Sequence, residues 1–175
     1  MDAPLGEAVI SRAEGRATIA GMSLLLDAIE RHQGLASRHE VLMSRILPAW
    51  FDLSVRYGRG VIRVRKGWYA RSDERPDVLR AWRVGGRLTC VSAAAFHAGV
   101  PAGPVLHVEV PAGAVRLRDP DHADRRLQPD AAVVVHWTRH PGPGDRRAVG
   151  VEHAEAVAAL CGVHAAGVRR HVSSR

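Results

Sequence analysis

The chain has 175 residues, enough for one compact domain or two small ones with a hydrophobic core. Its formal net charge of +7 favours a polyanionic partner, either nucleic acid or an anionic membrane surface. The sequence has no run of about 18 apolar residues and no signal-peptide pattern at its start, so we expect neither a membrane span nor secretion.

The first part of the chain is expected to consist of a flexible extension followed by a helix. Residues 1–21 carry three acidic side chains and no continuous apolar stretch, so we predict a flexible extension there. Residues 23–33 place Leu25, Leu26 and Ile29 at helical spacing, and the glycine that follows ends the pattern. This stretch is the first predicted helix.

Two further helices follow closely. Ser37 and Glu40 are three residues apart and match a capping box, in which each side chain satisfies the free backbone N–H of the other. Pro48 fits the first turn of a third helix, where its missing N–H costs nothing. Phe51 and Val55, four residues apart, supply the buried face of this third helix.

A β-hairpin is predicted directly after the third helix. Residues 61–64 alternate apolar and basic side chains, residues 65–67 provide a turn, and residues 68–70 begin the return strand. Three helices followed by a hairpin within residues 22–72 are the layout of a winged helix-turn-helix. In such a domain the third helix enters the major groove of DNA and the hairpin, or wing, lies beside it.

Positive charge is concentrated in this region. Residues 22–71 hold nine cationic side chains against four acidic ones, as expected for a nucleic-acid-binding surface. The predicted DNA-contacting side chains are Arg38, Arg45, Arg56, Arg59, Arg63, Arg65 and Lys66.

Two alternatives remain open for these cations. Arg63, Arg65 and Lys66 could belong to a solvated edge strand whose charges prevent aggregation. Arg56 and Arg59 are also placed favourably at the C-terminus of a helix. The outward face of the third helix is poor in side chains that read bases, so specificity is expected to be modest or to depend on Arg45 and the wing.

A second, small α+β domain is predicted over residues 76–140, which makes the whole chain an α+β protein. A linker, a C-terminal helix over residues 151–168 and a tail are expected within residues 141–175. The second domain is expected to contain two helices and three strands, at residues 76–86, 88–100, 105–111, 114–118 and 131–137.

The cysteines and histidines predict no metal site and no cofactor. Cys90 and Cys161 are isolated, without CxxC spacing, and buried free thiols fit the reducing cytoplasm. His97, His107 and His136 belong to different predicted elements, and none of them has the spacing of a compact local site.

The sequence also lacks a recognisable catalytic arrangement. Ser92 has no GxSxG context, and no glycine-rich phosphate loop follows a strand. Residues 119–124, "DPDHAD", lack the glycine and the terminal glutamate of a calcium loop, which favours a solvated turn. We therefore expect no enzymatic activity.

Four stretches together resemble a known family. "GLASRHEVL" (residues 34–42) and "VIRVRKGWYA" (residues 61–70) are similar to the N-terminal winged-helix domain of AbiEi-family antitoxins, the DNA-binding halves of type IV toxin–antitoxin systems. "GGRLTCVSAAAFHAGV" (residues 85–100) and "LHVEVPAGAVRLR" (residues 106–118) resemble the small domain that follows in some relatives. The resemblance covers roughly residues 22–137.

This resemblance implies a cytoplasmic transcriptional repressor that binds double-stranded DNA as a homodimer and acts by occupying its operator. It does not imply DNA cleavage, because the tail lacks the acid–acid–lysine arrangement of the nuclease domain found in some relatives. One alternative is a protein-interaction module that neutralises a toxin or a host protein through the second domain. Another is a repressor of a prophage or mobile element.

Overall fold

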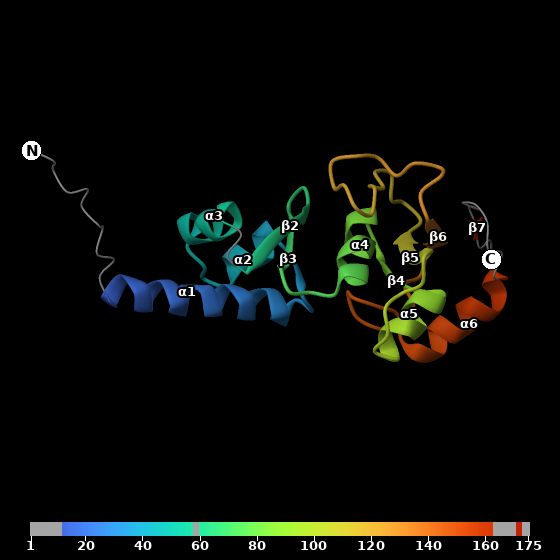
Figure 1. The fold of residues 1–175 in the computed structure, drawn as a ribbon, viewed down its shortest axis with the longest axis horizontal. Coiled ribbons are helices and arrows are strands. Elements are labelled where there is room, and N and C mark those ends of the chain that lie inside the picture. The colour runs from blue at the N-terminus through green and yellow to red at the C-terminus, as the bar shows by residue number, and fades with distance from the viewer. Residues whose placement is uncertain (1–11, 58–59, 163–170, 173–175) are drawn as a thin grey trace, which may run out of the picture.

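A computed structural model describes residues 12–57, 60–162 and 171–172 of the chain. Two lobes lie side by side (Figure 1), an N-terminal lobe within residues 12–72 and a second lobe that begins at Pro76. Both lobes contain helices and a small sheet, which confirms the α+β class. None of the described helices combines the length and the apolar character needed to cross a bilayer.

The N-terminal lobe contains three helices and a three-stranded antiparallel sheet with the strand order β1-β3-β2. Its elements are α1 (Arg12–Arg31), β1 (Leu35–Ser37), α2 (Arg38–Met43), α3 (Pro48–Arg56), β2 (Val61–Arg65) and β3 (Trp68–Arg71). The flexible extension predicted over residues 1–21 is wrong for residues 12–21, which are helical. Residues 1–11 lie outside the described part of the chain. Strand β1 was not predicted.

Local signals define the start of each short helix. The capping box is confirmed, because Oγ of Ser37 accepts from the backbone N–H of Glu40 and the Glu40 carboxylate accepts from the backbone N–H of Ser37. Pro48 begins α3 as predicted. In the hairpin, Gly67 takes a φ of 79°, which a glycine adopts without strain.

In its described residues, the second lobe contains three helices and a four-stranded sheet with the strand order β4-β5-β6-β7, in which β5, β6 and β7 are parallel. Its elements are α4 (Pro76–Val84), β4 (Arg87–Leu88), α5 (Cys90–His97), β5 (Leu106–Pro111), β6 (Val133–Thr138), α6 (Val151–Cys161) and β7 (His171–Val172). The strand predicted over residues 114–118 is wrong, because that segment forms only an isolated bridge between Arg118 and Arg126. The predicted helix over residues 151–168 ends at Cys161, and residues 163–168 lie outside the described part of the chain.

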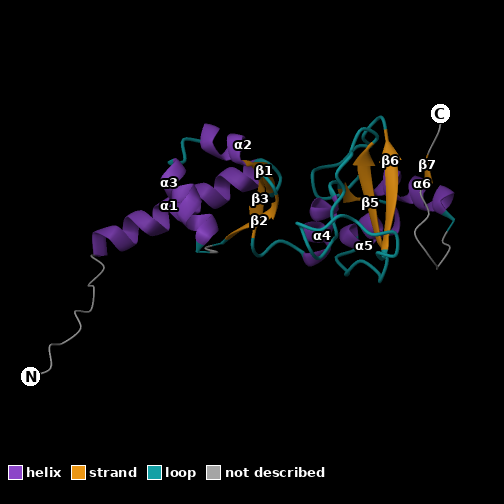
Figure 2. Ribbon diagram, turned by 90° about the horizontal axis from the view of Figure 1, so that it is seen from above, coloured by secondary structure: helices purple, strands orange, loops and turns teal. Residues whose placement is uncertain are grey.

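The larger of two hydrophobic clusters spans both lobes. A smaller cluster lies between α1, α2, α3 and the sheet of the N-terminal lobe. The larger cluster combines Leu35, Val64 and Ala70 of that sheet with Trp82 of α4 and the strands of the second lobe. The small sheet accordingly faces the second lobe (Figure 2). The boundary predicted between residues 72 and 76 therefore separates two sets of elements, but the larger cluster crosses it.

Two consecutive arginines also join the lobes. The Arg146 guanidinium lies 2.7 Å from the Glu40 carboxylate, and its backbone N–H donates to the side chain of Gln33. The Arg147 guanidinium contacts Glu30 at 2.9 Å and Glu74 at 2.8 Å. This segment lies between residue 141 and the helix at 151, where the linker was predicted, and it connects the second lobe to α1 and α2.

Candidate nucleic-acid interface

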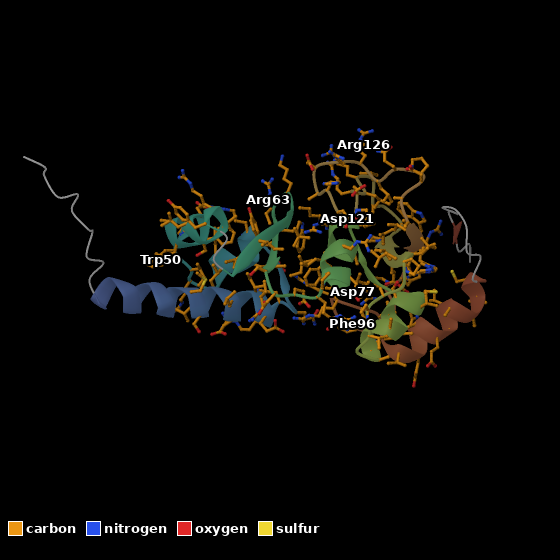
Figure 3. The ribbon with its side chains drawn as sticks, in the orientation of Figure 1. Trp50, Arg63, Asp77, Phe96, Asp121 and Arg126 are labelled. Atoms are coloured by element: carbon orange, nitrogen blue, oxygen red, sulfur yellow. The ribbon has the colours of Figure 1, made fainter. Side chains whose placement is uncertain are left out.

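One side of the N-terminal lobe presents α3 and the tip of the β2–β3 hairpin, while α1 runs along the opposite side (Figure 1). The side chain of Arg63 points away from the body of the lobe on this side (Figure 3). The predicted basic residues can therefore be divided into those that are exposed without a carboxylate partner and those that are paired or buried.

Four cations form the available group, which we call the free basic set: Arg45, Arg56, Arg63 and Lys66. All four are exposed, and none forms an ion pair with a carboxylate among the residues that the structure describes. They lie in the turn between α2 and α3, at the end of α3 and on the hairpin. These are the positions from which a helix-turn-helix with a hairpin reaches DNA phosphates.

The charge of Arg38 is largely compensated. Its guanidinium lies 3.3 Å from the Asp52 carboxylate, and it sits 5.7 Å from the centre of the Phe51 ring. The pair joins the first turn of α2 to α3 and neutralises the acid on the outer face of α3. The structure therefore gives Arg38 a role in holding the two helices together.

Arg65 is half-buried whereas Arg63 is exposed, so the structure separates two residues that the sequence analysis placed on one face. A bulge between the two residues breaks the alternation of β2. The Arg65 guanidinium lies 5.5 Å from the Trp68 ring and beside Gly85 of the second lobe, and burial lowers its pKa. Its Nε has no hydrogen-bond partner among the described residues.

Arg65 lines a cavity of about 250 Å³ between the lobes, together with Trp68 and Trp82. The wall also contains an ion pair between Arg87 and Glu109, 2.8 Å apart and largely buried. Arg59, the remaining predicted contact, lies outside the described residues.

The outer face of α3 matches the prediction. Phe51 is buried, whereas Pro48, Ala49 and Asp52 are exposed. Leu53 is also exposed, so the N-terminal part of the helix offers mainly apolar groups and one paired carboxylate to a ligand. Side chains that form bidentate contacts with bases are missing from this part of the described helix, and Arg56 lies only at its C-terminal end.

Several large apolar side chains are exposed close to the free basic set. Met43 is 72% exposed, and Leu47 and Tyr57 are each 63% exposed. They lie at the end of α2, before α3 and after α3. Exposed apolar groups concentrated around two short helices favour contact with another protein.

The structure also brings together residues that the sequence analysis left separate. Side-chain ligand atoms of Cys90, His107, His136 and Cys161 all lie within 4.8 Å of one another. Burial raises the pKa of the Cys90 thiol to about 11 and lowers the pKa of His107. No spacing within the sequence could reveal this cluster of cysteines and histidines, because its members belong to four different elements. The sequence signal for it was one histidine in each of two apolar strands.

No protein-family model matches the chain, and no curated protein matches it. The resemblance to AbiEi-family antitoxins therefore rests on the sequence motifs given above.

Proposed function

We propose that the N-terminal lobe is a winged helix that binds double-stranded DNA, and that the protein is a transcriptional regulator of the antitoxin-like repressor type. The element order α1-β1-α2-α3-β2-β3 and the sheet order β1-β3-β2 support the winged-helix assignment. In this assignment α3 is the recognition helix and the β2–β3 hairpin is the wing.

The observation that carries the proposal is the division of the arginines. Many arginines in both lobes are paired with carboxylates, including Arg75 with Asp77 and Arg87 with Glu109. The free basic set instead has no carboxylate partner among the described residues and lies on the turn between α2 and α3, at the end of α3 and on the hairpin. Exposed arginines without such a partner also occur in the second lobe, among them Arg116 and Arg126, but the free basic set occupies the elements that reach DNA in a winged helix. Because unpaired cations repel one another on a surface, four of them within residues 45–66 favour a polyanionic ligand.

Binding would depend mainly on phosphate contacts. Each neutralised phosphate releases a counterion and contributes about 0.9 to the slope of log K against log salt concentration. The apolar outer face of α3 provides few hydrogen bonds to base edges, so we expect a modest ratio of specific to non-specific affinity. Repression would follow from occupancy of the operator, with two copies of the chain on a repeated site in the cytoplasm.

The test is fluorescence anisotropy with a labelled duplex at several salt concentrations. The double variant Arg63→Ala, Lys66→Ala should weaken binding to all sequences and reduce the salt slope by about 2. Arg31→Ala is the matched control, because this arginine is exposed on α1, away from the free basic set. A wild-type protein that is not retained by DNA at low salt would rule the proposal out.

The exposed apolar residues favour a second candidate function, contact with a protein partner such as a cognate toxin. Met43, Leu47 and Tyr57 would lie in that interface. The substitution Leu47→Ser separates the two functions. It should abolish association with the protein partner or with a second copy of the chain. The slope of log K against log salt concentration for DNA binding should stay unchanged.

A further inference from the structure

Two cysteines and two histidines meet at one point of the second lobe. Cys90 is the first residue of α5, His107 lies on β5, His136 lies on β6 and Cys161 is the last residue of α6. Nδ1 of His107 is 3.1 Å from Nε2 of His136, and Sγ of Cys161 is 3.8 Å from each of these nitrogens. Thiolate and imidazole groups are the ligands that zinc prefers in structural sites.

The distances match the edges of a tetrahedral zinc site. With Zn–N of about 2.0–2.1 Å and Zn–S of about 2.3 Å, a tetrahedron has edges of about 3.3 Å between two nitrogens and about 3.6 Å between nitrogen and sulfur. The observed separations of 3.1 Å and 3.8 Å differ from these values by about 0.2 Å. The Sγ of Cys90 lies within 4.8 Å of the other three ligand atoms, so a shift of about 1 Å at most brings it to the length of a tetrahedral edge.

We propose that Cys90, His107, His136 and Cys161 bind one zinc ion in a closed Cys2His2 site. Because the protein supplies four ligands, no position is left for a substrate or a reactive water, and the site is structural. The proposal is independent of DNA binding, since all four residues belong to the second lobe.

The backbone orients the ligands toward a common point. β5 and β6 are parallel neighbours in which His107 is opposite Val134, two residues before His136, so both imidazoles lie on the same face of the sheet. The backbone N–H of His107 donates to the hydroxyl of Ser92 on α5, which connects this strand to the helix that carries Cys90.

Cys90 itself has an unusual conformation. Its φ is 52°, in the left-handed region that side chains other than glycine rarely adopt. Such strain is typical of residues held in place by a ligand.

A bound zinc ion would connect the parts of the second lobe that the chain does not connect directly. It would tie the start of α5 and the end of α6 to adjacent strands of the sheet. Since α6 ends at Cys161, the ion would anchor the end of this helix against β5 and β6.

The primary test uses the wild-type protein, produced without a polyhistidine tag and purified with a reductant and without a chelator. Mass spectrometry of the metals should find about one zinc per chain. Replacement of zinc by Co²⁺ should give the visible d–d absorption of a tetrahedral site and a thiolate-to-cobalt charge-transfer band. Removal of the metal should lower the Tm by roughly 10 °C.

Variants identify the ligands. Cys161→Ser and His136→Gln should lose the stoichiometric zinc and change the cobalt spectrum, whereas His122→Gln, at an exposed loop position, should retain both. A folded, reduced wild-type chain that contains no zinc and gives no cobalt spectrum would overturn the proposal. A Cys90–Cys161 disulfide in freshly purified protein would overturn it as well.

Discussion

The ion pair between Glu40 and Arg146 makes folding stability depend on pH in a way that one substitution can isolate. The Arg146 guanidinium donates to the Glu40 carboxylate at 2.7 Å, and chiefly for this reason the pKa of Glu40 falls from 4.5 to about 2. His32 lies 3.8 Å from the same carboxylate. Glu40→Gln removes the charge, but the amide oxygen of glutamine can still accept the hydrogen bond of the capping box with Ser37.

A pKa lowered from 4.5 to about 2 corresponds to at most about 3 kcal/mol of stability at neutral pH. Glu40 is 24% and Arg146 33% exposed, so solvent screening reduces the expected contribution to about 1–2 kcal/mol. Because the pKa is lowered in the folded state, this contribution is complete above the unfolded-state pKa of 4.5. It disappears as the pH falls toward 2.

Urea denaturation of the wild type and Glu40→Gln at pH 7, pH 4 and pH 2.5 measures this difference. We expect the wild type to be more stable by about 1–2 kcal/mol at pH 7, by less at pH 4, and by only about a quarter of the pH 7 difference at pH 2.5. Glu155→Gln, on an exposed position of α6, controls for the loss of a surface carboxylate and should show no such trend. A difference that is equally large at pH 7 and pH 2.5 would refute the electrostatic argument.

Two further substitutions test the division of the basic residues. Arg65→Met removes a half-buried guanidinium whose Nε is unpaired among the described residues, so the Tm should stay unchanged or rise. The salt slope for DNA binding should not change, and a slope reduced by about 1 would show that Arg65 contacts DNA. Arg45→Gly should stabilise the fold by about 1 kcal/mol in urea denaturation, because Arg45 has a φ of 62°. The same variant should weaken DNA binding in anisotropy, and loss of stability instead would contradict the assigned backbone strain.

Features that depend on neighbouring residues were predictable from the sequence. The capping box of Ser37 and Glu40, the start of α3 at Pro48 and the hairpin with its turn at Gly67 all follow from chemistry within a few positions. Strand β1 was missed because three residues between two helices are too few to show alternation.

Errors arose where a local pattern was modified by tertiary contacts. The alternation in "VIRVR" placed Arg63 and Arg65 on one face, but the bulge of β2 turns Arg65 toward the second lobe. The alternation in residues 114–118 has no neighbouring strand to pair with among the described residues and stays irregular. Cys90 and Cys161 were classed as isolated thiols because they are far apart in the sequence. They come close to His107 and His136 only in the folded lobe, where β5 and β6 pair in parallel.

The cluster that spans both lobes has a consequence for the proposed regulator. In the N-terminal lobe, one face of the sheet packs on α1, α2 and α3, and the other buries Leu35, Val64 and Ala70 against α4 of the second lobe. Arg65 of the wing strand lies beside Gly85 at the end of α4. The position of the β2–β3 hairpin therefore depends on the second lobe, so in the proposed regulator a ligand or partner that shifts α4 would also move the hairpin relative to α3. Regulation of DNA binding through the second lobe needs no additional contact with DNA.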